Sequence, residues 1–287
     1  YSGIGKTRLI EYVKEHNEQK SYLFVTGKFE QYEQEKPFKI IGQIIQQISD
    51  YLLANKEKDI KYYKNLISDT IGNNLYLLHE IAPGLEFITG QNFKNTTVNL
   101  IDSAQRLTQT IEKFIGLFVK PGKPLVIFMD DLQWADKASL NIIQKLIYSQ
   151  SDSAFCFVGA YRKEEVSFNN ALKSTIEDIQ KTHKNFKELE IKPLSEDDVK
   201  NFLSDLLNIK TGFQDLLNVL LNRTMGNPYF IIEYITSLYD QKLIQFDSHK
   251  NTWTWDIDKI KDQKVTANIA DLISQKINNQ DKKTIQI

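Results

Sequence analysis

The sequence of 287 residues predicts an α/β fold: a doubly wound parallel sheet with a large helical insertion, followed by further helices and a small hairpin. Three observations predict it. Short apolar runs of buried-strand type alternate with amphipathic helical segments, which is the order of a parallel sheet covered by helices. The chain opens on a glycine-rich turn that ends in Gly5-Lys6-Thr7, and a distant apolar run ends in Asp130-Asp131. Because such sheets bind ligands at the carboxyl ends of their strands, we expect both motifs at one edge.

Residues 1–9 fit the end of a phosphate-binding loop, whose pattern is G-x-x-x-x-G-K-[ST]. Its glycines let backbone N–H groups approach phosphates, its lysine reaches the β- and γ-phosphates, and its threonine hydroxyl binds Mg²⁺. The residues assigned to this loop are Ser2, Gly3, Ile4, Gly5, Lys6, Thr7 and Arg8, of which Arg8 faces either the nucleotide or solvent. The alternative is a glycine-rich turn before a helix. The first glycine of the pattern falls before Tyr1, and Asp281–Ile287 looks like the start of an unfinished helix, so we expect a piece of a longer chain.

The elements that follow the loop are predicted from periodicity. They are a helix over Lys6–Lys20, a strand over Ser21–Thr26 and an amphipathic helix over Lys39–Leu53. Residues 57–120 contain no strand signal and predict an all-helical insertion, which includes a long helix over Asn99–Val119.

The apolar run Pro124–Met129 predicts a buried parallel strand, and two acidic residues follow it. Beside a phosphate loop, Asp130 would hold Mg²⁺, mostly through water, and Asp131 would polarise the attacking water. The alternative is a pair of solvated aspartates that cap the next helix. Since both motifs occur with suitable strands and helices, we interpret them as the two halves of a P-loop NTPase site.

Further alternation completes the predicted sheet. The elements are a helix over Lys137–Ser149, a strand over Ala154–Ala160, a helix over Asn169–Lys181 and a final strand over Lys187–Ile191. After Pro193 the chain becomes helical, starting with Ser195 as N-cap and Asp198 three residues on. Ile244–Asp247 and Thr252–Asp256 then predict a hairpin with Trp253 and Trp255 on one face. It suits the wing of a winged-helix-like unit, and a simple two-stranded flap is the alternative.

These boundaries divide the chain into three parts. Residues 1–193 form the α/β core, with the insertion at about 57–120; residues 194–240 form a helical lid; residues 241–287 form a partial winged-helix-like segment.

The composition excludes several classes of protein. With 36 basic and 37 acidic residues the net charge is −1, which argues against a general polyanion-binding surface. No apolar run approaches the roughly 20 residues of a membrane span, and charges interrupt the N-terminal segment where a signal peptide needs an apolar core. The lone Cys156 excludes an intramolecular disulfide, and the four histidines lack metal-ligand spacing. We therefore expect a cytoplasmic protein.

The segment Leu125–Asp136 resembles the extended Walker B segment of the STAND class of AAA-like signalling ATPases. Other segments similar to that class are Gly27–Tyr32 after the second strand, Val158–Arg162 in the sensor 1 region, and Gly226–Phe230, a helix start that touches the nucleotide from the lid. The resemblance covers essentially the whole chain. It is closest to the ATPase module of large hybrid proteins with a Ser/Thr kinase-like domain, a GAF domain and a sensor histidine kinase, whose segment beyond the lid fits Val265–Ile273.

The resemblance implies an ASCE or AAA-like P-loop fold that takes ATP and Mg²⁺ as ligands. Arg162 would read the charge of the γ-phosphate, and Pro228 would pack against adenine. The alternatives are a surface arginine at a strand end and a proline tolerated in the first turn of a helix. The absence of a guanine-reading motif favours ATP over GTP. The implied partners are ATP, ADP and kinase or other signalling domains of the same polypeptide, and a nucleotide-dependent oligomer is compatible with the class.

Three functions compete. The first is an ATP-dependent signalling switch in which nucleotide binds between core and lid, and hydrolysis or exchange moves the lid. We expect slow hydrolysis, because Asp131 is one methylene shorter than the glutamate of many AAA-type motors. The second is a DNA-associated AAA-type ATPase of the origin-recognition or transcription-regulator kind, which the near-neutral charge and four scattered arginines disfavour. The third is a non-hydrolysing scaffold, against which the intact Lys6, Thr7 and Asp130 argue.

Overall fold

The computed structural model describes residues 3–16, 22–31, 37–54, 56–91, 93, 103–150, 153–166 and 168–262. The described residues belong to two compact units. The first lies within Thr7–Glu188, and the second combines those of Ser2–Lys6 with those of Leu189–Ile287. No helix in the described part of the chain is long and apolar enough to cross a membrane.

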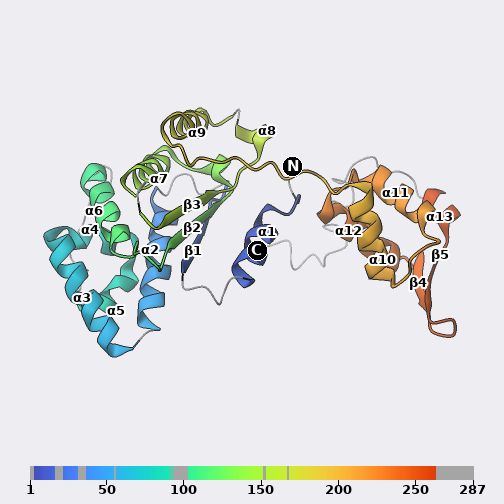
Figure 1. The fold of residues 1–287 in the computed structure, drawn as a ribbon, viewed down its shortest axis with the longest axis horizontal. Helices are drawn as coiled ribbons and strands as arrows, with labels where there is room; N and C mark the ends of the chain where they lie inside the picture. The colour runs from blue at the N-terminus through green and yellow to red at the C-terminus, as the bar shows by residue number, and fades with distance from the viewer. Residues whose placement is uncertain are drawn as a thin grey trace, which may run out of the picture. The chain divides into compact units, whose positions relative to one another are not determined.

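A parallel three-stranded sheet lies at the centre of the first unit (Figure 1). Its strands are β1 (Leu23–Lys28), β2 (Leu125–Asp130) and β3 (Phe155–Gly159). The order is β1-β2-β3, so the longest apolar run of the sequence forms the middle strand. The register pairs Lys28 with Asp130 and Met129 with Gly159, which brings the carboxyl ends of the strands to the same edge. The predicted α/β class with a parallel sheet is confirmed.

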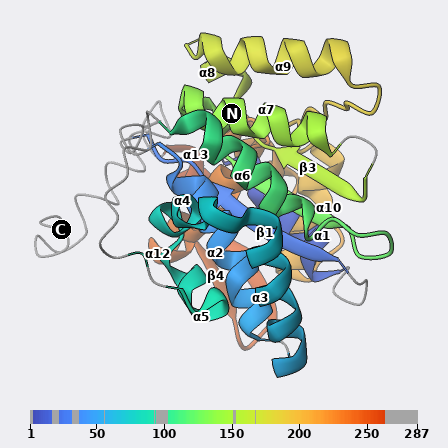
Figure 2. The ribbon, with the colours of Figure 1, turned by 90° about the vertical axis from the view of Figure 1, so that its left-hand side faces the viewer.

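Helices pack around this sheet. They are α1 (Lys6–Glu15), α2 (Lys39–Leu53), α7 (Lys137–Ser149), α8 (Lys163–Val166) and α9 (Asn170–Thr182). The isoleucine face of α2 is buried and packs against β1, whereas α7 packs against α9. Figure 2 shows α8 and α9 at the top and α7 below them. The predicted bounds of α2 and α7 are confirmed; α1 ends at Glu15, earlier than the predicted Lys20.

The described residues of the predicted insertion form helices that are joined by short turns and irregular segments. It contains α3 (Glu57–Ile71), η1 (Gly72–Asn74), α4 (Leu75–Ile81), η2 (Pro83–Leu85), α5 (Glu86–Thr89) and α6 (Ala104–Gly116). The start of the long helix predicted from Asn99 lies outside the described residues, and α6 ends at Gly116 rather than Val119. Gly42 of α2 allows a close approach, because a Cβ there would lie 2.1 Å from the Ile81 carbonyl oxygen.

The strand predicted over Lys187–Ile191 is wrong. The segment is irregular, and its apolar Leu189 is 78% exposed. A strand is stabilised by hydrogen bonds to a neighbouring strand, and no described strand pairs with this segment. A side-chain bond holds it instead: the Tyr161 hydroxyl donates to Glu188. Burial, reinforced by the Glu188 carboxylate, raises the pKa of Tyr161, so the phenol remains a donor at neutral pH.

The second unit has its own core of helices and a hairpin. Its elements are α10 (Glu196–Leu207), α11 (Gln214–Thr224), α12 (Pro228–Asp240), β4 (Ile244–Asp247), β5 (Thr252–Trp255) and α13 (Ile257–Asp262). The predicted N-cap is confirmed, since Ser195 and Asp198 form a reciprocal capping box at the start of α10. The predicted hairpin is also confirmed, with Trp253 half-buried against Tyr239 and Phe246. The predicted segment Val265–Ile273 lies outside the described residues.

Candidate active site

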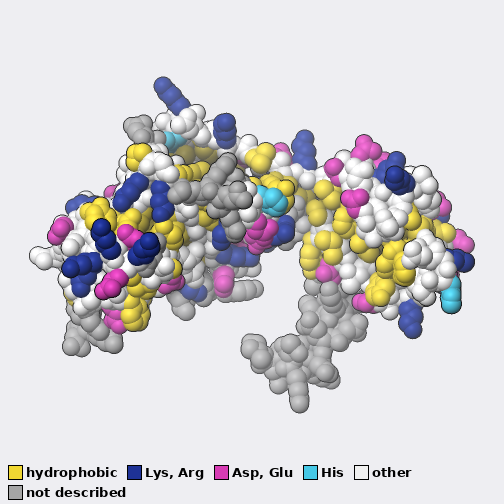
Figure 3. Space-filling model, turned by 60° about the horizontal axis from the view of Figure 1, so that its bottom comes forward, with side chains coloured by type: hydrophobic (Ala, Val, Ile, Leu, Met, Phe, Trp, Pro, Cys, Tyr) yellow, Lys and Arg dark blue, Asp and Glu magenta, His cyan; other side chains and the backbone are white. Residues whose placement is uncertain are grey.

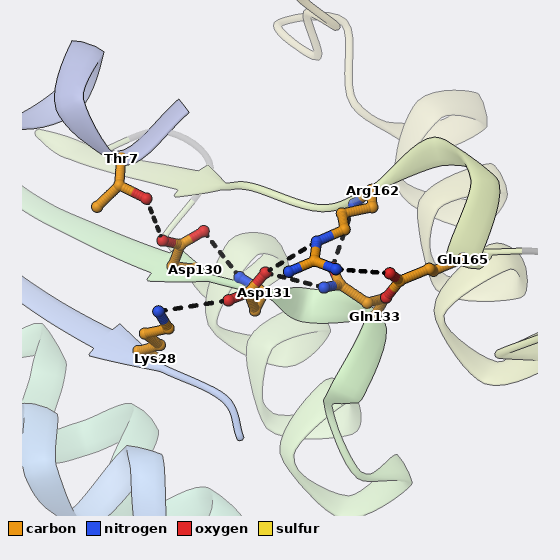
Figure 4. A network of polar contacts seen from close by, with 7 residues as sticks. All are labelled: Thr7, Lys28, Asp130, Asp131, Gln133, Arg162 and Glu165. Carbon is orange, nitrogen blue, oxygen red and sulfur yellow. Dashed lines mark hydrogen bonds and ion pairs between the residues drawn. The ribbon is translucent and has the colours of Figure 1, made fainter. Parts of the chain in front are cut away.

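The structure brings together the two residues predicted to hold Mg²⁺. Asp130 ends β2 and is buried, and Thr7 lies in the first turn of α1. The Thr7 hydroxyl donates to Asp130 Oδ2 at 2.5 Å, and the Asp131 backbone N–H donates to Asp130 Oδ1 at 2.9 Å (Figure 4). Both carboxylate oxygens are therefore oriented by fixed donors.

The chemistry of this pair fits magnesium. Mg²⁺ prefers oxygen ligands, retains several waters, and is held in NTPase sites by few protein groups together with substrate phosphates. Thr7 and Asp130 offer one hydroxyl and one carboxylate. Among the described residues there is no group of three or more His, Cys, Asp or Glu side chains that could hold a metal. A cation bound here would therefore take most of its ligands from water and phosphate.

A cavity of about 400 Å³ opens beside the pair, within the first unit. Thr7 and Lys14 of α1 line one side, and Lys28, Phe128 and Asp130 of the sheet line another. Lys28 and Asp130 lie at the carboxyl ends of β1 and β2, so the cavity reaches the edge at which sheets of this kind bind ligands.

Asp131 follows β2 directly and leaves the extended conformation there. Its backbone lies in the left-handed region, with φ 54° and ψ 43°, and the residue is only 7% exposed. Three groups surround its carboxylate: Gln133 Nε2 donates to Oδ1 at 2.8 Å, Arg162 Nε lies 3.7 Å from Oδ1, and Lys28 Nζ lies 3.6 Å from Oδ2 (Figure 4). The carboxylate thus lies between two cationic side chains and one amide donor.

Arg162 lies just beyond the carboxyl end of β3 and is held on several sides. Its Nη1 pairs with Glu165 Oε1 at 2.7 Å, and its guanidinium lies 5.1 Å from the centre of the Trp134 ring. Its backbone N–H donates to Gln133 Oε1 at 3.1 Å. The Trp134 side chain thus packs on the arginine.

The start of α12 contacts the phosphate loop within the second unit. Gly3 and Gly5 have φ of 73° and 97°, a region that favours glycine. The Tyr229 N–H donates to the Gly3 carbonyl at 3.3 Å, and a Cβ on Gly3 would lie 2.7 Å from Tyr229 Cβ. Pro228 is the first residue of α12, and Asn227 caps it by accepting from Tyr229 N–H at 3.1 Å. Gly3 therefore packs against the helix start that carries Pro228.

The other residues of the predicted loop differ in their surroundings. Ile4 is buried, and Lys6 begins α1. The guanidinium of Arg8 lies 3.3 Å from both Glu11 and Glu15 of the same helix, and the bond to Glu11 is the main reason that the pKa of Arg8 is raised. Ser2 lies outside the described residues.

Sequence reasoning left three contributors to this site unassigned: Lys28, Gln133 and Glu165. Lys28 could have been found, because it ends a strand that is parallel to the one ending in Asp130. Gln133 and Glu165 carry no comparable signal, since their roles depend on neighbours brought close by the fold.

Comparison with known proteins gives a family match. Residues 1–158 match the AAA ATPase domain family, a stretch that includes the phosphate loop and the Asp130-Asp131 pair but ends before Arg162. No solved structure matches with significance.

Two curated signalling proteins are similar to the chain. Hybrid signal transduction histidine kinase G of Dictyostelium discoideum is 24% identical over 352 aligned residues, which cover 100% of this chain and 10% of that protein. Peroxide stress-activated histidine kinase mak3 of Schizosaccharomyces pombe (strain 972 / ATCC 24843) is 26% identical over 139 residues, which cover 48% of this chain and 6% of that protein. The chain thus spans a tenth or less of the length of either relative.

Proposed function

Because this chain belongs to the AAA ATPase domain family and is distantly homologous to parts of signalling histidine kinases, we propose that it is an ATP-binding, Mg²⁺-dependent switch module. In this proposal it hydrolyses ATP slowly, within a larger signal-transduction protein. The observation that carries it is the meeting of Thr7 with Asp130, and of Asp131 with Arg162, at one edge of the sheet. Walker-type chemistry needs these groups together.

Each residue has a role in the proposed reaction. The loop backbone, including Gly3 and Gly5, cradles the phosphates, and Lys6 places a positive charge on the β- and γ-phosphates. Thr7 and Asp130 hold Mg²⁺, which when bound neutralises charge that develops on the phosphates. Pro228 packs against adenine.

Hydrolysis in this proposal uses Asp131 and Arg162. Asp131 accepts a hydrogen bond from the attacking water and orients it toward the γ-phosphate. Arg162 stabilises the charge that develops there. For this, Arg162 must leave Glu165 and bind the γ-phosphate instead, which would change the contacts of the segment after β3. This exchange gives the switch a physical basis. The segment after β3 would differ between nucleotide states, because Arg162 has two competing partners, Glu165 and the γ-phosphate.

The alternative of a DNA-associated ATPase gains no support from the face of the molecule drawn in Figure 3. Figure 3 shows basic and acidic side chains on both units of the face that it draws. Arg223, one of only four arginines in the sequence, bonds to the Ile260 backbone carbonyl at 3.1 Å, which ties α11 to α13. Salt-dependent DNA binding would favour this alternative.

The proposed function is tested by Lys6→Ala. Loss of a charge-assisted phosphate contact costs on the order of 2–5 kcal/mol, so the Kd for ATP should rise by roughly 30-fold or more. Titration calorimetry with and without Mg²⁺ measures this. The matched control is Lys58→Ala on the exposed face of α3, which should bind ATP like the wild type. Unchanged affinity in Lys6→Ala would refute the assignment.

A further inference from the structure

The side-chain amide of Gln133 connects the two residues proposed to act in hydrolysis, Asp131 and Arg162. Its Nε2 donates to Asp131 Oδ1 at 2.8 Å, while its Oε1 accepts the Arg162 backbone N–H at 3.1 Å (Figure 4). Gln133 is only 5% exposed. One buried amide therefore spans from the carboxylate after β2 to the backbone after β3.

An amide is well suited to this position. A carboxylate only accepts hydrogen bonds and a backbone N–H only donates them, so the linking group must donate at one end and accept at the other. Glutamine does both. A glutamate would place a second acceptor against Asp131, and an apolar side chain of the same size would satisfy neither partner.

The backbone around Gln133 is also fixed. Asn169, the N-cap of α9, donates through Nδ2 to the Gln133 carbonyl at 3.1 Å and to the Ala135 carbonyl at 3.2 Å. The preceding Leu132 N–H donates to the Ala160 carbonyl at 2.9 Å. Since both sides of this short 3₁₀ turn, η3 (Leu132–Trp134), are tied down, the amide has little freedom to rotate away.

The two oxygens of Asp131 are occupied unequally. Oδ1 accepts from Gln133 and lies near Arg162, whereas the group recorded beside Oδ2 is Lys28, at 3.6 Å, whose side chain is 64% exposed. A long exposed lysine can move aside, but a buried amide cannot. If Lys28 moves aside, Oδ2 is the oxygen left to accept a hydrogen bond from a water molecule.

We propose that Gln133 is a positioning residue for hydrolysis, an inference that rests on the proposed ATPase function. It holds Oδ1 of Asp131 so that Oδ2 faces the attacking water. It also makes this orientation depend on the position of the Arg162 backbone, because the same amide accepts from the Arg162 N–H. The water is therefore aligned only when the segment after β3 keeps its position beside the end of β2. Gln133 acts through Asp131 and touches no substrate.

The test compares Gln133→Met with the wild type in single-turnover ATP hydrolysis. Loss of the amide should lower the rate constant by about 10- to 100-fold, because small misplacements of a catalytic group have large effects on rate. The Kd for ATP should stay close to that of the wild type, since the phosphate loop is untouched. Gln133→Glu, which keeps the size but removes the donor, should lose at least as much rate. The melting temperature should fall somewhat in both variants, because buried groups of Asp131 or Arg162 lose a hydrogen-bond partner. Gln144→Met on α7 is the control for the same chemical change and should keep the wild-type rate.

The outcomes separate this inference from the proposed function. If the wild type hydrolyses ATP and Gln133→Met does so equally fast, the role of Gln133 is overturned and the proposed function stands. A loss of ATP affinity in both Gln133 variants as large as the loss of rate would also overturn it, because it indicates a structural role. A wild type that hydrolyses no faster than Lys6→Ala overturns both.

Discussion

Asp131 combines a rare backbone conformation with a crowded side chain. A non-glycine residue with positive φ is uncommon, but Asp tolerates the left-handed region better than most residues. Here this conformation begins η3 directly after β2, which places the carboxylate between Lys28 and Arg162. Such local strain is often found at functional sites, and it argues for a functional rather than a merely solvated aspartate.

The neighbouring residue Asp130 has different partners from Asp131, and a different prediction follows from them. Asp130 accepts a hydrogen bond from the Thr7 hydroxyl, whereas the carboxylate of Asp131 lies beside Lys28 and Arg162. We expect Asp130→Asn to weaken Mg²⁺-dependent hydrolysis far more than nucleotide binding, because its carboxylate acts through the metal whereas the loop backbone holds the phosphates. Titrating ATP with EDTA and then with Mg²⁺ measures the two effects separately.

The matched control for Asp130 is Asp136→Asn, which removes a carboxylate that caps α7 by accepting from Ser139 N–H at 2.9 Å. It should leave the Mg²⁺ dependence of binding unchanged. If the affinity of Asp130→Asn for ATP without Mg²⁺ fell as much as its turnover, Asp130 would have a structural role instead.

At the scale of elements, the capping box stabilises the start of α10 by an amount that depends on pH. The Ser195 hydroxyl and backbone N–H both lie within hydrogen-bond distance of Asp198 Oδ2, at 2.6 Å and 3.0 Å. These bonds to Ser195, the side-chain bond first, hold the pKa of Asp198 below its usual range. A carboxyl whose pKa is lower when folded stabilises the folded state above its unfolded pKa of about 3.9, and the contribution is lost as the pH falls through the folded pKa.

We therefore expect Asp198→Asn to lower the stability of α10 at pH 7 and to differ less from the wild type at pH 3. Amide hydrogen exchange of α10, corrected for the intrinsic rate at each pH, measures this locally. Asp197→Asn is the control: it removes a charge from the same turn without touching the capping box. An equal effect of both variants at pH 7 would mean that the helix dipole, rather than the Ser195 bonds, accounts for the stabilisation.

Helices and strands were predictable where the residue pattern of the segment itself determines its structure. The isoleucines of α2 recur at helical spacing, and the run before Asp130 is apolar throughout, so both elements are found where the pattern places them. Lys187–Ile191 alternates like a strand but is not one, because a strand also needs a neighbour, and periodicity carries no information about neighbours.

At the scale of the whole molecule, the candidate site was predictable only in part. The motif residues Thr7, Asp130 and Asp131 could be assigned from the sequence, because phosphate chemistry limits which residue types can serve in such a site. Gln133 and Glu165 were not, because an amide or a carboxylate acquires a role only from the groups beside it. The family match shares this limit, since it ends at residue 158, before the segment that carries Arg162.

The rate of hydrolysis is a property of the whole molecule, and we expect it to be slow. Asp131 reaches less far toward water than a glutamate would, and a misplacement near 1 Å can cost about 100-fold. Turnover should lie well below the median enzyme value of about 10 per second, as suits a timer rather than a motor. Since missing partners could also slow the isolated chain, the decisive variant is Asp131→Asn, which should bind ATP in calorimetry yet lose residual hydrolysis. Retained hydrolysis would place the catalytic carboxylate elsewhere, with Asp136 the next candidate despite its capping bond to Ser139.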